Sequence, residues 1–250
     1  MSASALCCTP VLQTITDREV KMLKLLIIIP AYNEAENIVR VVEELKEKVP
    51  QYDYVVVNDG SSDNTALICQ QHGYHLLNLP CNLGLAGAFQ TGINYAYQKG
   101  YDAVIQIDGD GQHDPAYIPK MMEMMETGAY DLIIGSRFVT EKRPNTLRML
   151  GNAIIEWAVF VTSGQKMTDP TSGMRIFGKS LIDTIAHGMD YKPEPDTIVF
   201  FLRHGAKMKE VQVHMRERVA GESYLSMGRA IGYMIHTCMN IFILQWVKKK

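Results

Sequence analysis

Two aspartates that alternate with glycines, in the sequence DGDG at residues 108–111, are the clearest chemical feature of the chain. The preceding run, 103–107, is short and mostly apolar, which is typical of a buried strand. Two carboxylates at a strand end can turn toward one point, where a divalent cation would remove their mutual repulsion. Gln112 and His113 add an amide carbonyl and an imidazole within reach, and the glycines leave room for a diphosphate. A plain surface turn is the alternative, because Asp-Gly is a common turn pair.

The same arrangement recurs after two earlier apolar runs. Residues 24–29 lead into Asn33 and Glu34, and residues 54–57 lead into a turn that begins with Asp59. Amphipathic segments separate the runs, and this β-α-β-α order predicts an α/β fold with a parallel sheet and right-handed crossovers. Ligands bind at the carboxyl ends of such strands, so we expect the three acidic clusters to form one site.

Local patterns predict the remaining elements. The first helix should have Asn33 as its N-cap and end at Pro50. Further strands are expected at 75–79, 132–135, 176–177 and 211–215, and further helices at 64–72, 82–99, 148–162, 181–186, 191–204 and 229–247. The last helix is amphipathic, and its polar face carries Tyr233, His236, Thr237 and Asn240.

Composition limits the class of protein. A chain of 250 residues with 47% hydrophobic residues can form one large α/β domain or two small ones. The net charge of -2 gives no reason to expect nucleic-acid binding, and five cysteines without a CxxC motif indicate reduced thiols in a cytosolic setting. There is no signal-peptide pattern. We expect a disordered leader at 1–22, a catalytic domain at 23–228 and an amphipathic helix at 229–250.

Two common nucleotide-binding motifs are missing. The first apolar run is followed by PAYNE rather than by the GxGxxG of dinucleotide-binding domains, and GxxxxGK[ST] does not occur. The expected site is therefore neither a usual dinucleotide site nor a P-loop.

Four successive stretches resemble the family 2 glycosyltransferases of the GT-A fold: IIIPAYNEAENI, VVVNDGSSDNT, NLGLAGAFQTGINYA and IQIDGDGQHDP. The resemblance runs from about residue 26 to 223 and implies a mostly parallel, Rossmann-like sheet flanked by helices. Within the family, GDGQH, GSRF, DPTSGMR and RERVAGES resemble the dolichyl- and polyprenyl-phosphate sugar transferases. The chain is most similar to a small bacterial group without transmembrane helices of its own, for which a separate small integral membrane protein is the expected partner.

The resemblance implies a role for individual residues at the donor site. Pro30, Tyr32 and Glu34 would line the nucleoside pocket, and Asp59 would contact the base or ribose. The loop and helix that edge the donor site carry Gly84 and Gln90.

The resemblance also implies the catalytic, metal and acceptor residues. Asp108 would contact the donor, and Asp110 and Gln112 would hold Mg²⁺ or Mn²⁺ against the diphosphate. The acceptor phosphate would be received by Ser136, Arg137, Arg175, Arg216 and Arg218. The residues expected to be catalytic are Asp108, Asp110, Arg137, Arg216 and Arg218.

Each of these roles has a structural alternative. Arg137 or Arg175 could instead pair with a carboxylate. Arg216 and Arg218 alternate along an expected strand end and so face the same side, which favours function. His113 is more typical of a packing residue than of a metal ligand.

Three readings of the function remain open. The first is a metal-dependent, inverting transfer from a nucleotide sugar, with UDP-glucose preferred, to polyprenyl (undecaprenyl) phosphate for cell-surface polysaccharide or glycan synthesis. Ionised phosphate needs no strong general base. The second is transfer to a sugar hydroxyl, with Glu194 or Asp196 as the base, although both could be simple first-turn helix carboxylates. The third is a catalytically silent nucleotide-sugar-binding subunit.

A lipid acceptor would place the protein in the cytoplasm, peripheral to the inner face of the plasma membrane. The helix at 229–250 would then lie on the membrane or against a partner helix, and packing on its own domain is the alternative.

Overall fold

The computed structural model describes residues 22–109, 111–143, 147–189, 191–216, 234 and 236–244. The expected leader, except for Met22, lies outside the described residues. So do Asp110, Arg218 and most of the expected helix at 229–250.

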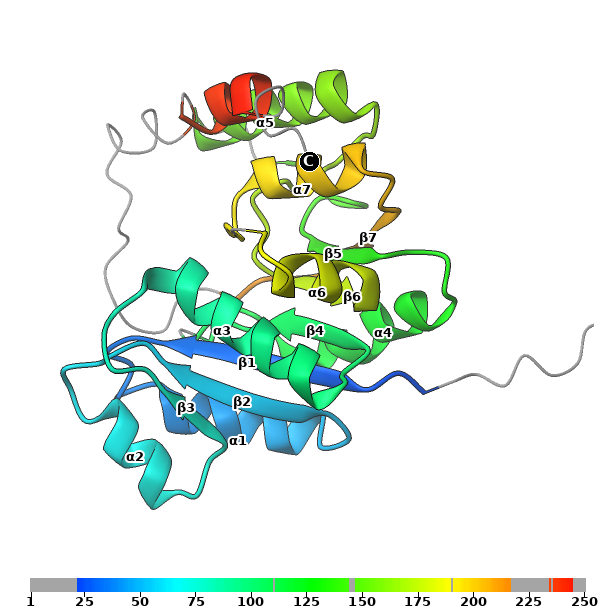
Figure 1. The fold of residues 1–250 in the computed structure, drawn as a ribbon. Coiled ribbons are helices and arrows are strands. Elements are labelled where there is room, and N and C mark those ends of the chain that lie inside the picture. The colour runs from blue at the N-terminus through cyan, green and yellow to red at the C-terminus, as the bar shows by residue number, and fades with distance from the viewer. Residues whose placement is uncertain are drawn as a thin grey trace, which may run out of the picture.

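A seven-stranded sheet in the order β3-β2-β1-β4-β6-β5-β7 forms the centre of the molecule (Figure 1). β6 runs antiparallel to both of its neighbours, and every other pairing is parallel, so the predicted mostly parallel α/β fold is confirmed. The strands are β1 (Leu25–Ala31), β2 (Asp53–Asn58), β3 (Leu76–Asn78), β4 (Ala103–Gln106), β5 (Leu132–Ser136), β6 (Arg175–Gly178) and β7 (Met208–Gln212).

Strand β7 begins earlier than the expected strand at 211–215. It forms the edge of the sheet next to β5, and its sequence MKEVQ is only partly buried. An edge strand that is half exposed needs no continuous apolar run, which is why hydrophobicity placed it too late.

The helices cover both faces of the sheet. They are α1 (Ile38–Lys48), α2 (Thr65–Gln71), α3 (Gly84–Lys99), α4 (Ile118–Glu126), α5 (Leu147–Ser163), α6 (Lys179–Ala186) and α7 (Pro195–Arg203), with a 3₁₀ turn η1 (Pro115–Tyr117) and a π-helical turn η2 (Asn240–Leu244).

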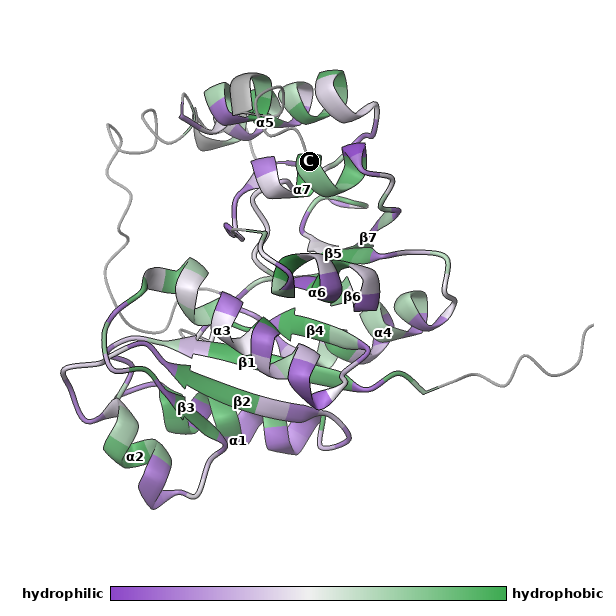
Figure 2. Ribbon diagram, viewed as in Figure 1, coloured by the Kyte–Doolittle hydropathy of each residue, from purple (hydrophilic) through white to green (hydrophobic). Residues whose placement is uncertain are grey.

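Alternate residues of β1 belong to two separate cores. Leu26 and Ile28 pack in the core that includes residues of α3, α5, α6 and α7, whereas Leu25 and Ile27 pack in the core that includes α1 and α4. This alternation follows from the period of two along a strand. Figure 2 shows the resulting pattern, with mostly hydrophobic strands such as β1 and β4 beside helices such as α1 and α3 that mix hydrophobic and hydrophilic residues.

The described part of the C-terminal segment packs on its own domain. It contacts α5 and α7, and Thr237 and Ile241 are fully buried. Thr237 belongs to the face that the sequence assigns as polar, so polarity alone did not identify the exposed side. Among the described residues, no helix combines the length and the apolar character that crossing a bilayer requires.

Gly60 is the turn residue on which the packing at the end of β2 depends. Its φ is +64°, and an added Cβ would lie 2.5 Å from the carbonyl carbon of Cys81. Gly73 has nearly the same φ, +65°, but an added Cβ there would meet nothing within 4 Å. Substitutions at the two glycines therefore allow the energetic cost of backbone strain to be measured apart from the cost of steric overlap.

We predict that Gly73→Ala lowers the free energy of unfolding by about 1 kcal/mol, because alanine tolerates a left-handed conformation poorly. Gly60→Ala should cost about 3 kcal/mol, because the turn at 81–82 must also move. Urea titrations of both variants measure the difference. Equal losses would show that the approach of Gly60 to Cys81 does not constrain this turn.

Candidate active site

The strand register brings the three predicted acidic clusters to one edge of the sheet. Ala31 at the end of β1 pairs with Asn58 at the end of β2, and Ile28 pairs with Gln106 at the end of β4. A Cβ added to Gly109 would lie 3.4 Å from the Pro30 carbonyl oxygen and 3.3 Å from Cγ of Glu34. The loop after β4 therefore packs directly on the turn after β1.

The turns after β1 and β2 are interlocked by hydrogen bonds. Asn33 has a φ of +56°, and its Oδ1 accepts the backbone N–H of Ser62 at 2.9 Å. The backbone N–H groups of Asn33 and Glu34 donate to Ser61 Oγ and Thr65 Oγ1. The prediction that Asn33 caps α1 is wrong, because the N-cap is Asn37 and the Asn33 side chain is used to join the two turns.

Asp59 links the end of β2 to the start of α3. It is only 2% exposed, and its Oδ1 accepts the backbone N–H of Leu83 at 2.7 Å. Gly84 follows as the first residue of α3. Tyr32, in the turn after β1, is by contrast 47% exposed. Of the residues expected to surround a nucleoside, Tyr32 offers an open surface and Asp59 a rigid support.

Gln90 joins α3 to the segment before α7. Its side-chain amide donates to the Ile185 carbonyl at 3.1 Å and accepts the backbone N–H of Tyr191 at 3.3 Å. Burial above all, together with the Asp108 carboxylate, raises the pKa of Tyr191 to about 12, against the lowering effect of Arg175. The Tyr191 phenol is therefore protonated at neutral pH.

Asp108 is held in one orientation and yet remains accessible. Its Oδ1 accepts from Gln106 Nε2 at 2.7 Å, and its backbone N–H donates to Nδ1 of His113 at 3.3 Å. Its side chain is 34% exposed, whereas His113 is 4% exposed. The Asp108 carboxylate can thus meet a ligand, while buried His113 supports the backbone.

The residues predicted to bind a metal ion are only partly described. Asp110 lies outside the described residues, and within those that are described no three His, Cys, Asp or Glu side chains gather closely enough to hold a metal ion. Gly111 has a φ of +75° and lies against the Arg40 guanidinium. The Gln112 carbonyl accepts the backbone N–H of Arg216 at 3.0 Å, which ties this loop to the segment after β7.

Arg216 is paired with two carboxylates. Its Nη1 lies 2.7 Å from Oε1 of Glu44 on α1, and its Nη2 lies 2.6 Å from Oδ2 of Asp114. β7 ends at Gln212, so the expectation that Arg216 and Arg218 alternate along a strand end does not hold for Arg216, and Arg218 lies outside the described residues. In this structure Arg216 therefore connects the site loop to α1.

Arg137 also pairs with a carboxylate, as the structural alternative predicts. It forms a two-point contact with the fully buried Asp169, through Nε to Oδ2 at 2.7 Å and Nη2 to Oδ1 at 2.8 Å. The Arg137 side chain is still 26% exposed. Such a pair has well-defined geometry and leaves the guanidinium within reach of a ligand.

The two other described residues that are expected to bind the acceptor are buried. Arg175 is 3% exposed and donates to the carbonyls of Ser172 and Pro170. The Ser136 side chain is fully buried, and its Oγ lies 2.7 Å from Oγ1 of Thr168. Both residues hold the loop 168–173 in place.

The loop 168–173 closes the site against Asp108. A Cβ on Gly173 would lie 3.2 Å from Cε1 of His113 and 3.5 Å from Oδ2 of Asp108. Glu210 accepts the backbone N–H groups of Thr168 and Asp169 at 2.8 to 3.0 Å.

Sequence analysis did not identify Asp169 or Glu210 as site residues. The signal for Glu210 was its spacing from Gln212, because two polar residues that are separated by one residue on a strand share a face. Gln212 Nε2 donates to the Arg137 carbonyl at 2.9 Å, so both side chains support the same cluster.

Glu194 and Asp196 lie at the start of α7. Glu194 occupies the N-cap position, and Asp196 is in the first turn. Burial first, and then the nearby Asp196, raise the pKa of Glu194, while His236 and Lys192 lower it. A carboxyl group with a raised pKa suits proton transfer, so Glu194 stays a candidate base.

Comparison with known proteins gives consistent matches along the chain. Residues 26–187 match the family described as "Glycosyl transferase family 2". The undecaprenyl-phosphate mannosyltransferase of Micrococcus luteus is 30% identical over 223 residues, which cover 82% of this chain and 89% of that protein. The UDP-N-acetylglucosamine–dolichyl-phosphate N-acetylglucosaminyltransferase of Methanococcus voltae is 30% identical over 187 residues, 66% of this chain and 74% of that protein.

Solved structures share the fold at lower identity. Glucosyl-3-phosphoglycerate synthase from Mycobacterium tuberculosis, in complex with phosphoglyceric acid, aligns with a TM-score of 0.65 and 19% identity over 88% of this chain and 80% of that one. The same enzyme in complex with Mn²⁺, UDP and glucosyl-3-phosphoglycerate aligns with a TM-score of 0.62 and 16% identity over 91% and 81% of the two chains.

Asp114 allows the network around Arg216 to be tested by pH. Partial burial opposes its ionisation, but the Ala116 N–H, Arg216 and Lys48 outweigh that effect and lower the pKa of Asp114 to about 2. A carboxyl group with a lowered pKa stabilises the fold above its unfolded pKa, and this stability is lost as the pH falls toward the folded value.

We predict that Asp114→Asn lowers the free energy of unfolding at pH 7 by about 2 kcal/mol. The difference from the unchanged protein should shrink between about pH 4 and pH 2, where Asp114 becomes protonated. Denaturant titrations across this range measure it. A difference that stays constant down to pH 2 would contradict the network.

Proposed function

Because the chain belongs to glycosyl transferase family 2, we propose that it transfers a sugar from a nucleotide-sugar donor to the phosphate of a polyprenyl phosphate. The geometric observation that carries the catalytic part is Asp108, which is fixed by Gln106 and accessible where three strand ends meet. The acceptor class is supported by relatives whose names specify undecaprenyl and dolichyl phosphate and which match most of the chain.

The donor would bind along the carboxyl edge of the sheet. The open ring of Tyr32 would pack against the base, and Pro30, Glu34 and Asp59 would form the walls of the nucleoside pocket. Hydrogen bonds between the two turns fix Asn33 and Glu34, so the walls of the proposed pocket would need little rearrangement when the donor binds. Gly84 and Gln90 would border the diphosphate and sugar from α3.

A divalent cation fits the residues at the end of β4. Mg²⁺ and Mn²⁺ favour oxygen ligands, and Mg²⁺ is commonly held by one or two carboxylates together with water and substrate phosphates. Asp110 and Gln112 would hold the ion beside Asp108, which would contact the donor, so a cluster of three acidic side chains is not required. When bound, the ion supplies Lewis-acid stabilisation of the departing nucleoside diphosphate. A distant structural neighbour has been crystallised with Mn²⁺ and UDP, which is consistent with this assignment.

The acceptor reacts through a phosphate oxygen. That oxygen attacks the anomeric carbon, the bond from this carbon to the donor diphosphate breaks, and the configuration inverts. A phosphate monoester is largely ionised at neutral pH, so it needs cations for positioning rather than a strong base. Among the described arginines expected at the acceptor, Arg137 is the best placed, because it is partly exposed and pairs with one carboxylate, whereas Arg175 is buried and Arg216 is paired with two carboxylates.

The identity of the transferred sugar is the most specific part of the proposal. UDP-glucose, the donor preferred from the sequence, is the first to test. GDP-mannose and UDP-N-acetylglucosamine follow, because the relatives' names include mannosyl and N-acetylglucosaminyl transfer. A membrane-lipid acceptor would place the reaction at the inner face of the plasma membrane and would serve cell-surface polysaccharide or glycan synthesis. A small integral membrane protein is a proposed partner there.

The cation and Asp110 provide the first functional test. We predict that transfer of labelled sugar into the lipid fraction with undecaprenyl phosphate stops in excess EDTA and returns with Mg²⁺ or Mn²⁺. Asp110→Asn should lower the rate by about a hundredfold or more, because a charged ligand is lost. Its melting temperature should stay unchanged. Full turnover in EDTA would refute the metal assignment.

Glu194 distinguishes the lipid-phosphate acceptor from a sugar-hydroxyl acceptor. We predict that Glu194→Gln keeps its rate to within about tenfold, because ionised phosphate needs no general base. The variant should melt at the same or a higher temperature, because burial disfavours the charged form of Glu194. A loss of about ten-thousandfold at unchanged stability would instead identify Glu194 as a base and favour the hydroxyl acceptor.

A further inference from the structure

Helix α5 has an apolar side that the rest of the described molecule leaves uncovered. Ile154, Trp157 and Val161 are spaced by three and four residues, so they share one side of the helix. Together with Phe160, these three side chains form the surface that we call the α5 face. Their exposed fractions are 46% for Ile154, 60% for Trp157, 44% for Phe160 and 54% for Val161. The opposite side of α5 packs into the core through Ile155, Ala158 and Val159.

The α5 face continues onto the C-terminal segment. The rings of Trp157 and Phe242 are 6.1 Å apart, and Met239 is 53% exposed beside fully buried Ile241. Figure 1 shows α5 and this segment together at one end of the molecule, with α2 at the other. Several large apolar side chains therefore gather at one end, which is unusual for a surface that contacts only water.

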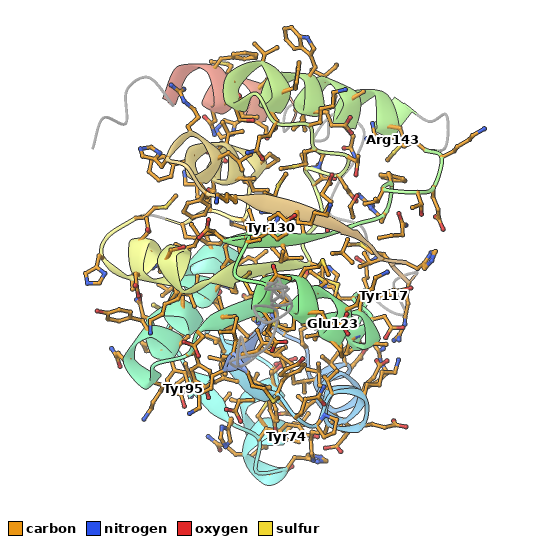
Figure 3. The ribbon with its side chains drawn as sticks, turned by 90° about the vertical axis from the view of Figure 1, so that its right-hand side faces the viewer. Tyr74, Tyr95, Tyr117, Glu123, Tyr130 and Arg143 are labelled. Carbon is orange, nitrogen blue, oxygen red and sulfur yellow. The ribbon has the colours of Figure 1, made fainter. Side chains whose placement is uncertain are left out.

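Helix α5 is also joined directly to the loop that closes the site. Asn152 Nδ2 donates to Thr171 Oγ1 at 3.2 Å, and Arg143 bridges Glu156 on α5 and the Thr168 carbonyl at 2.5 Å each. Arg143 is labelled at this end of the molecule in Figure 3, with Tyr74 at the opposite end. The α5 face and Asp108 thus lie on either side of one well-connected loop.

We propose that the α5 face is a membrane-contact surface, which binds an anionic lipid bilayer and positions the catalytic site next to it. This inference rests on the proposed lipid-phosphate acceptor, whose hydrocarbon chain stays in the membrane. Lys142 and Lys166 are exposed near the two ends of α5, and they would meet anionic headgroups while Trp157 enters the interface. α5 has 17 residues and does not qualify as a membrane span, so it would lie along the surface.

A second copy of the chain fits this face less well. Stable interfaces between proteins bury about 800 Å² on each partner and involve roughly 20 residues a side. The α5 face and Met239 provide five exposed apolar side chains. A bilayer needs only a few apolar anchors and a positive rim, so it is the occupant that these residues favour.

The first experiment uses the tryptophans as reporters. The chain has two, and Trp246→Phe leaves Trp157 as the only one. With vesicles of phosphatidylcholine and phosphatidylglycerol, we expect its emission to shift to the blue and to be quenched by brominated acyl chains. The shift should weaken at high salt and with pure phosphatidylcholine, because the lysines then contribute less. Unchanged emission with anionic vesicles would overturn the proposal.

The second experiment compares Val161→Glu with a matched control. Leu67 on α2 is 49% exposed, similar to Val161, but lies at the far end of the molecule, so Leu67→Glu adds the same charge away from the proposed surface. We expect Val161→Glu to weaken vesicle binding by about tenfold or more and Leu67→Glu to leave it unchanged. Val161→Glu should raise the apparent KM for undecaprenyl phosphate in vesicles and leave turnover of a water-soluble short-chain prenyl phosphate within about twofold.

The outcomes separate this proposal from the proposed function. Absence of transfer to either acceptor would refute the proposed function, whereas vesicle binding is measured independently of it. Equal loss with both acceptors, or equal loss of vesicle binding in both variants, would overturn the membrane-contact surface. A dimer in sedimentation experiments that Val161→Glu dissociates, without any vesicle binding, would assign the face to contact between copies instead.

Discussion

The close packing of the loop after β4 on the turn after β1 is the contact on which the site depends. Gly109 has the Pro30 carbonyl and the Glu34 side chain within van der Waals distance of where its Cβ would be. This approach is possible because β4 and β1 are parallel neighbours whose carboxyl ends lie at the same edge of the sheet. It sets Asp108 beside the residues proposed to hold the nucleoside, and it would place the donor diphosphate between them.

A second group of contacts completes the site from the other half of the sheet. Because β6 runs antiparallel to β4, the start of β6 and the loop 168–173 that precedes it lie at the edge where β4 ends, close to Asp108. Asp169 within this loop pairs with Arg137, and Glu210 on β7 accepts backbone N–H groups of Thr168 and Asp169. Charged groups buried without partners would be costly, and these carboxylates are instead satisfied by donors from Arg137 and from the loop itself. The loop also contacts α5, which is how a membrane contact could be transmitted to the site.

The sequence was most informative where a buried strand runs into a polar turn. The ends of β1, β2 and β4 were predicted because continuous apolar runs stop there. It was less informative where contacts between distant segments determine the partners or the burial of polar residues. Asn33 joins two turns instead of capping a helix, Arg216 pairs with Glu44 and Asp114, and Thr237 is buried on its own domain. Those outcomes depend on segments far apart in the chain, which local periodicity cannot detect.

The chemical linkage of the product tests the central claim most directly. The protein would be given a nucleotide sugar labelled with carbon-13 at the anomeric position, together with undecaprenyl phosphate or undecaprenol, and the extracted lipid examined by NMR. The account predicts a product only with undecaprenyl phosphate, in which the labelled carbon is coupled to a single phosphorus and has inverted configuration. A labelled carbon bonded to a hydroxyl oxygen without phosphorus coupling, or equal transfer to undecaprenol, would contradict it.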